Sequence, residues 1–150
     1  MTLTIQTCPA NQAPMHLLLE ADPDPLKIRR YLNDGLCRVA HVDGMQVGVY
    51  VLQVMAPEWV ELMNIAVVPA QQGQGIGRQL LDDAISQARQ LGARRLELGT
   101  GSFGPQLAFY QRAGFRVVAV EPDYFLEHYA EPLFEHGLQH KDRLRLALAL

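Results

Sequence analysis

The sequence predicts an α/β protein in which helices cover a mixed β-sheet, and three observations support this. Short β-rich segments come in series in the first half and then alternate with amphipathic segments of helical period. Asp43-Gly44 separates two β-rich runs, which is the strongest short-range signal for a hairpin. Glycine or proline marks the ends of most segments. This order is typical of a mixed sheet, here of about six to seven strands flanked by about four helices.

The first half of the chain is expected to supply a short strand, two helices and three strands. Pro25 near the start and Gly35 after the end are the expected boundaries of the second helix. The hairpin signal at residues 43–44 divides the next β-rich stretch into two strands, and Pro69 ends the third. In chain order, these segments cover residues 3–7, 13–22, 24–35, 36–57 and 58–69.

A change of period begins the second half. From Gly75, apolar residues recur with helical spacing as far as Leu91, and Gly92 follows as a C-terminal glycine. The last eight residues, 143–150, alternate strictly, so their four leucines lie on one face of a strand. Between these segments the sequence predicts a strand over 94–99, a short helix over 105–114 and a strand over 115–122.

Length and composition exclude several classes of protein. The 150 residues suit a single domain, 1–150, with one core. A formal net charge of −3 argues against a broad nucleic-acid surface. No apolar run is long enough to span a membrane, and the N-terminus lacks a signal-peptide pattern, so a cytoplasmic location is expected. Cys8 and Cys37 are expected to be reduced thiols.

Neither the histidines nor the cysteines predict a metal site. His136 and His140 are four residues apart, but Gly137 interrupts any helix between them, and no carboxylate or cysteine pattern completes a zinc site. Between positions 117 and 140 the chain has five carboxylates and no Lys or Arg. This acidic segment is either a solvated face or a wall that attracts a cationic substrate.

The stretch QQGQGIGRQLLDDAISQARQLG (71–92) places three glycines where a helix begins. Glycine is unfavourable inside a helix, but at its entrance it permits positive φ and close approach by another molecule. The first turn of a helix has unpaired N–H groups and the positive end of the helix dipole. This entrance is therefore expected to bind a phosphate or pyrophosphate, and Arg78 adds a positive charge.

Two common phosphate-binding motifs do not explain these glycines. A P-loop requires Lys followed by Ser or Thr after its last glycine, whereas Arg78 and Gln79 follow Gly77. The dinucleotide pattern G-x-G-x-x-G is absent here, although GTGSFG (99–104) matches it elsewhere. That second match comes late in the chain and precedes only a short helix.

The remaining pattern, Q/R-x-x-G-x-G/A, is met by Gln72, Gly75 and Gly77, and here the chain resembles the GCN5-related N-acetyltransferase (GNAT) superfamily. LMNIAVVPAQQGQGIGRQLLDDAI is similar to that family's strand, acetyl-CoA loop and helix, without a gap. LAFYQRAGF is similar to its later helix, which carries a tyrosine. The order of elements agrees along nearly the whole chain, and the tail resembles that of a small group of bacterial members. The resemblance implies the GNAT-like acyl-CoA N-acyltransferase fold.

The resemblance implies acetyl-CoA as cosubstrate, with no metal. Acetyl-CoA would lie between the two central parallel strands, with its pantetheine paired to the backbone of the strand before the loop and its pyrophosphate on the N–H groups of the loop. Many members have an asparagine after the next strand that contacts the cofactor, whereas this chain has Ser102. The cofactor-binding residues implied are Ile65, Ala66, Val67, Gln72, Gly73, Gln74, Gly75, Ile76, Gly77, Arg78 and Ser102.

The resemblance also implies roles in catalysis. An amine near pKa 10.4 must lose a proton before it attacks, and the leaving thiolate benefits from a proton donor. Tyr110 matches the family's tyrosine and is the candidate acid; the alternative is an ordinary core tyrosine. Glu61 and Glu97 match base positions in different members; the alternatives are surface carboxylates and a water chain.

The implied function is transfer of an acetyl group from acetyl-CoA to a primary amine, on a small molecule or a peptide, by direct attack in a ternary complex. A cationic amine is among the acceptors expected, because of the acidic segment. A homodimer is expected because dimers are common in the family, although no interface is identified in the sequence. The alternative is a non-catalytic acyl-CoA sensor or partner-binding domain on the same fold.

Overall fold

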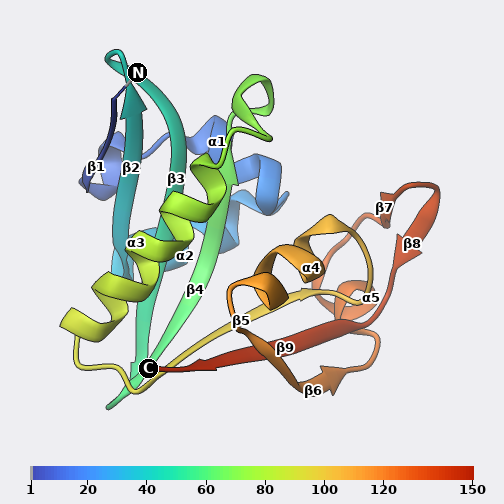
Figure 1. Ribbon diagram of the computed structural model, residues 1–150. Coiled ribbons are helices and arrows are strands. Elements are labelled where there is room, and N and C mark those ends of the chain that lie inside the picture. The colour runs from blue at the N-terminus through green and yellow to red at the C-terminus, as the bar shows by residue number, and fades with distance from the viewer. Residues whose placement is uncertain (1) are drawn as a thin grey trace. The chain divides into compact units, whose positions relative to one another are not determined.

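A computed structural model describes residues 2–150 of the chain, which fall into two compact units (Figure 1). The first unit comprises the residues up to Arg94 together with Leu150. The second unit comprises Arg95–Ala149.

The first unit is built on four antiparallel strands in the order β1-β2-β3-β4. The predicted hairpin is confirmed: Asp43 and Gly44 join β2 to β3 with φ of 51° and 78°, which is the left-handed geometry of a tight two-residue turn. The β3–β4 ladder is interrupted twice: Val51 pairs with Asn64 while Leu52 pairs with Leu62, which makes a bulge at Met63, and the register shifts again between Val54 and Ala56. The strands are β1 (Leu3–Thr7), β2 (Leu36–Val42), β3 (Met45–Ala56) and β4 (Trp59–Val67).

Helices cover both faces of this four-stranded sheet. Val39, Val49 and Val51 point to the face where α1 (Met15–Ala21) and α2 (Pro25–Asp34) form a buried cluster with them. Alternate residues of a strand face opposite ways, and Arg38 and Tyr50 of the same strands reach Asp83 of α3 (Ile76–Gln90). Helix α3 therefore lies on the other face, as Figure 1 shows.

Helix α3 is held against the sheet by an apolar stripe and by a polar cluster. Its sheet-facing residues, including Ile76, Leu80 and Ala84, are buried as the helical period predicts. Gly48 of β3 leaves space for this helix, since a Cβ there would lie 2.6 Å from Leu80 Cδ1. Two turns after Ile76, Asp83 accepts hydrogen bonds from Arg38 and Tyr50.

The second unit contains a three-stranded antiparallel sheet in the order β5-β9-β6. The strands are β5 (Arg95–Gly101), β6 (Arg116–Glu121) and β9 (Arg143–Ala149). Helix α4 (Pro105–Arg112) connects β5 to β6 (Figure 1). Its Tyr110 belongs to the buried core of this unit. The other core members include Leu96, Leu98, Phe115 and Leu146.

The predicted strands and helices are present, but three short elements of the second unit were not predicted. These are α5 (Tyr124–His128) and a hairpin of β7 (Leu133–Glu135) and β8 (Leu138–His140). Segments of three to five residues are too short to show a period. The hairpin turn also uses His136 beside Gly137, with φ of 52° and 76°, instead of the usual Asn or Asp. Residues 2–150 thus form nine strands and five α-helices, more than the estimate from the sequence.

Candidate active site

The entrance to α3 has the geometry expected of an anion-binding site. Gly73 and Gly75 have φ of 80° and 82°, a left-handed backbone that other residues rarely adopt. Gly75 is the N-cap, no side chain caps the helix, and no acidic residue lies in its first turn. The first helical hydrogen bond runs from Gln79 N–H to Gly75 C=O at 3.1 Å, so the N–H groups of the three preceding residues remain to bind a ligand.

Space is open beside these glycines. A Cβ at Gly73 or Gly75 would meet no atom within 4 Å, so packing does not require glycine at either position. The requirement is conformational, and the space remains accessible to a ligand. Because the positive end of the α3 dipole faces this space, an anionic group is favoured there.

Gln72 ties the loop to the strand before it. Its Nε2 donates to the carbonyl oxygen of Val67 at 3.1 Å, across the short turn Pro69–Gln71. Arg78 is half-exposed and its guanidinium lies 3.0 Å from Asp82, one turn further along α3. An exposed pair at this spacing contributes only about 0.3–0.5 kcal/mol, so Arg78 can change partner at little cost.

Strand β4 carries the predicted residues that precede the loop. Ala66 is buried, and Ile65 and Val67 on either side are half-buried. Glu61 is a buried carboxylate in the same strand, opposite Gln53 of β3. Between Glu61 and Ile65 lies the bulge, where Met63 is the extra residue, and a bulge changes the direction in which neighbouring side chains point.

A buried polar network beside these residues was not predicted from the sequence. Asn64 of β4 is buried, and its Nδ2 donates to the Leu18 carbonyl oxygen at 3.0 Å and to the Tyr31 hydroxyl at 2.9 Å. Tyr31 in turn donates to Asp22 Oδ2 at 3.1 Å. The network fixes α1 and α2 to β4 at the bulge. Its members are 9 to 46 residues apart in sequence, so no local pattern could have found it.

In the second unit, Tyr110 lies on α4 among aromatic rings. The Phe109 and Phe115 rings meet it edge to face, with centroids 5.2 and 6.0 Å away. Burial raises the pKa of the Tyr110 phenol, so the hydroxyl stays protonated at neutral pH. This environment fits a hydrogen-bond or proton donor. It also fits the alternative stated from the sequence, in which Tyr110 is an ordinary core residue.

Glu97 lies on β5 and is bound on both sides by arginines. Arg145 Nη2 donates to Glu97 Oε1 at 2.8 Å, and Arg95 forms an ion pair with Oε2. The Glu97 side chain is 12% exposed. Both carboxylate oxygens are therefore already engaged, which weakens the case for Glu97 as a proton acceptor.

The acidic segment is partly neutralised within the second unit. Arg143 Nε donates to Glu121 Oε1 at 2.7 Å. Burial alone would raise the pKa of Glu121, but the hydrogen bond and charge of Arg143 outweigh it and lower that pKa. Glu135 pairs with His140 at 2.9 Å. Ser102 is exposed and follows the last residue of β5.

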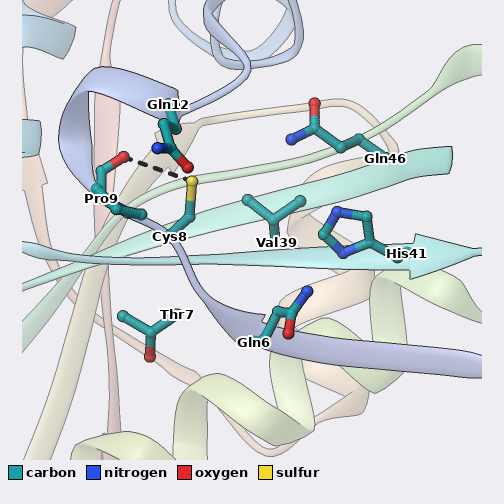
Figure 2. Close-up of a pocket in the computed structure, with 8 residues that line it drawn as sticks. All are labelled: Gln6, Thr7, Cys8, Pro9, Gln12, Val39, His41 and Gln46. Atoms are coloured by element: carbon teal, nitrogen blue, oxygen red, sulfur yellow. Dashed lines mark hydrogen bonds between the residues drawn. The ribbon is translucent and has the colours of Figure 1, made fainter. Parts of the chain in front are cut away.

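A pocket of about 150 Å³ in the first unit is lined by none of these residues (Figure 2). Cys8 and His41 line it, among polar side chains of β1 and neighbouring segments. Cys8 and Cys37 are free thiols, as expected; burial raises the pKa of Cys8, and that of Cys37 to about 12, so both stay protonated at neutral pH. Within residues 2–150 no cluster of His, Cys, Asp or Glu could hold a metal ion, and no helix is long and apolar enough to cross a membrane.

Comparison with known proteins places this geometry in context. A family model described as an acetyltransferase (GNAT) domain matches residues 33–117. The uncharacterised N-acetyltransferase YvbK of Bacillus subtilis is 46% identical over 135 residues, which is 89% of this chain and 87% of that protein.

Two solved structures match over nearly the whole chain. An IAA acetyltransferase from Bacillus cereus matches with a TM-score of 0.96 at 43% identity, covering 99% of this chain and 100% of that one. A GNAT family acetyltransferase from Elizabethkingia anophelis with acetyl-CoA bound gives a TM-score of 0.95 at 37% identity, covering 99% and 98%. These matches confirm the fold class predicted from the sequence.

Proposed function

Because the chain belongs to the GNAT acetyltransferase family, we propose that it transfers the acetyl group of acetyl-CoA to a primary amine, by direct attack within a ternary complex. The observation that carries this proposal is the entrance of α3, where Gly73 and Gly75 leave N–H groups and open space for an anion. The pyrophosphate of acetyl-CoA supplies such an anion. The Elizabethkingia anophelis protein, 37% identical, was solved with acetyl-CoA bound.

In this proposal the backbone supplies most of the cofactor contacts. The N–H groups from Gln72 to Arg78 bind the pyrophosphate, and the backbone of Ile65–Val67 pairs with the pantetheine as one strand pairs with another. Gln72 holds the loop to β4 through Val67, which keeps these two contact regions in a fixed relation. Ser102 is a further proposed contact. Local backbone binding explains how a chain of net charge −3 can take an anionic cosubstrate.

Two proton transfers accompany the reaction. The attacking amine must be neutral, and the nitrogen loses a further proton as the amide forms. We assign Tyr110 as the donor to the departing sulfur, because it matches the family's tyrosine; burial raises the pKa of its phenol, which favours a hydrogen bond to the thiolate over complete proton transfer. The proposed proton acceptor is Glu61, Glu97 or a chain of waters, and the arginines that hold both oxygens of Glu97 weaken the case for that residue. A cytoplasmic location and a homodimer stay predictions.

Binding of acetyl-CoA is tested with a matched pair of glycine variants. Gly75 and Gly44 have φ of 82° and 78°, and a Cβ at either position would meet no atom within 4 Å. Changing either to alanine should therefore cost a similar stability of about 1–2 kcal/mol through backbone strain alone. Only Gly75→Ala should weaken acetyl-CoA binding, because its methyl group enters the space open to the pyrophosphate and its backbone strain shifts the loop; the loss of one charge-assisted hydrogen bond in this way corresponds to about tenfold. Equal affinities measured by calorimetry would remove the α3 entrance from the proposal.

Turnover separates the enzyme from a non-catalytic sensor. Release of CoA thiol is measured with a panel of primary amines that includes diamines, polyamines and peptides with free α-amines, and acetylated products are identified by mass spectrometry. Amine-dependent thiol release supports the transferase. Tight acetyl-CoA binding without acetylation of any amine would support the sensor function instead.

A further inference from the structure

In the second unit, the β7–β8 hairpin holds the turn that connects β5 to α4. The turn is Gly101-Ser102-Phe103-Gly104. It begins at the last residue of β5 and ends immediately before Pro105, the first residue of α4. Two hairpin side chains make the contact, Glu135 at the end of β7 and His140 at the end of β8. They are also bonded to each other, with His140 Nε2 lying 2.9 Å from Glu135 Oε1. We call this pair the hairpin clasp.

The two glycines of the turn are sites of close approach to the clasp. A Cβ at Gly101 would lie 2.5 Å from Nδ1 of His140 and closer still to Cε1 of the same ring. A Cβ at Gly104 would lie 2.6 Å from Oε1 of Glu135. Gly101 is not among the residues with positive φ, so the His140 ring, and not the backbone, excludes a side chain there.

Stacking fixes the imidazole as well. The rings of Phe103 and His140 are parallel within 7°, with centroids 4.1 Å apart, and Phe125 closes on the imidazole at 5.5 Å. The side chains of His140 and Glu135 are only 14% and 24% exposed. A hydrogen-bonded pair removed from water is stronger than an exposed one, so the clasp holds the turn at Gly101, Phe103 and Gly104 together.

The clasp does not face a substrate. His140 Nδ1 is buried and has no hydrogen-bond partner among residues 2–150, which leaves the ring no accessible nitrogen for a reacting amine. The effect of the clasp must therefore pass through the turn. The turn carries Ser102 and leads into α4, whose N-cap Gly104 has no side-chain capping bond of its own and whose sixth residue is Tyr110.

We propose that His140 and Glu135 are positioning residues for acetyl transfer: they hold the 101–104 turn so that α4 presents Tyr110 at a fixed place. This inference rests on the proposed function, in which Tyr110 is the donor to the departing sulfur. It predicts that loosening the clasp lowers kcat much more than acetyl-CoA affinity, because a small displacement of a proton donor slows the reaction strongly, whereas most proposed cofactor contacts lie outside the turn.

The test is a double-mutant cycle between Gly101 and His140. Gly101→Ala should lower kcat about tenfold or more, because its methyl group displaces the imidazole. His140→Ala should have a similar effect by removing the ring. In the double variant the added methyl group meets no ring, so Gly101→Ala should then cost nothing further. The Kd for acetyl-CoA should rise by much less than kcat falls in all three variants, because Ser102 is the one proposed cofactor contact that lies on this turn.

His128→Ala is the matched control. His128 is a histidine of the same unit that also stacks on an aromatic ring, Tyr124, at 4.1 Å, and its Nδ1 lies 2.9 Å from the Tyr124 carbonyl oxygen. It lies outside the clasp, so its loss should leave kcat within about twofold. Two results would overturn the proposal: full activity in Gly101→Ala, or effects of Gly101→Ala and His140→Ala that multiply in the double variant.

A second readout separates this inference from the proposed function. The same cycle is followed by hydrogen exchange of the amides of Phe103, Gly104 and Gln106, which needs no turnover. Faster exchange in both single variants, with no addition in the double, would establish the clasp physically. If that coupling appears in a protein that acetylates no amine, the proposed function fails and the catalytic purpose of the clasp fails with it. If acetylation is observed without that coupling, the clasp alone is refuted.

Discussion

The polar cluster between the sheet and α3 offers a sharp test of what holds the helix that carries the glycine loop. Asp83 accepts from Arg38 Nε at 2.8 Å and Nη2 at 3.2 Å, and from the Tyr50 hydroxyl at 2.5 Å. Arg38 also donates to Thr7 Oγ1 and to the Ile5 carbonyl oxygen. The hydrogen bond with Asp83 is the main reason that the pKa of Arg38 is raised. One carboxylate thus joins α3 to β2 and β3.

Asp83→Asn removes the negative charge and keeps nearly the same shape. Breaking a buried ion pair costs about 3–5 kcal/mol, since the remaining charge is left uncompensated. The Arg38 and Asp83 side chains are 15% and 20% exposed, and the guanidinium keeps its bonds to β1, so we expect a loss at or just below the lower end of this range, about 2–3 kcal/mol. For a chain of this length that corresponds to a fall in Tm of about 5–10 °C.

The assay is thermal and urea unfolding of Asp83→Asn, Arg38→Met and the double variant, followed by circular dichroism. The two changes should be strongly non-additive, because the second removes the charge that the first left unpaired. As a control, Asp82→Asn alters the neighbouring acid, whose exposed pair with Arg78 contributes about 0.3–0.5 kcal/mol. A loss below about 0.5 kcal/mol for Asp83→Asn would show that the cluster is not what fixes α3.

Three further predictions address other sites. Tyr110→Phe should lower kcat about tenfold to a hundredfold and leave the Kd for acetyl-CoA unchanged, as measured by thiol release and calorimetry; unchanged kcat would return Tyr110 to a core role. Asn64→Ala should lower the free energy of unfolding by about 2 kcal/mol, because the buried Leu18 carbonyl and Tyr31 hydroxyl oxygens lose their hydrogen-bond donor. An unchanged free energy in urea unfolding would contradict this. Arg143 lowers the pKa of Glu121, so the stability from this pair is present above the ordinary pKa of 4.5 and is lost as pH falls through the lower folded value. Acid unfolding of Glu121→Gln should therefore depend less on pH in that range than does unfolding of the exposed-site control Glu131→Gln.

The parts of the site that could be predicted are those set by adjacent residues. The α3 entrance follows from glycines at alternate positions before an amphipathic run, and the φ values of Gly73 and Gly75 bear out the expected local geometry. The 43–44 hairpin and the glycine after α3 were predictable for the same reason, since each depends on a few consecutive dihedral angles. Local sequence restricts local backbone conformation directly.

The parts that were missed depend on pairs that only tertiary structure brings together. Asn64 meets Leu18 and Tyr31 from 46 and 33 residues away. In the sequence, His136 is the residue whose spacing suggests a joint role with His140, because it lies four residues before it. That pair predicts no metal site. The actual partner is Glu135, brought close by a two-residue turn that carries an unusual histidine. The alternation in LFE and LQH around His-Gly was the available signal for that hairpin.

Pairs formed only in the tertiary structure also change what the acidic segment, residues 117–140, implies about the acceptor amine. In the sequence it shows five carboxylates without a basic residue, which suggests a surface for a cationic amine. In the structure, Glu121 pairs with Arg143, which lies just after that segment. Glu135 pairs with His140, the last residue of the segment. Among residues 2–150 no ion pair involves the other three carboxylates, Asp123, Glu127 and Glu131. In the described part of the chain, only Glu121 is paired with a permanent cation, Arg143, so a cationic acceptor would be attracted by the remaining carboxylates of the segment and not by all five. Because exposed charges are screened over about 8–10 Å at physiological salt, any preference for polyamines that arises from them must weaken as ionic strength rises.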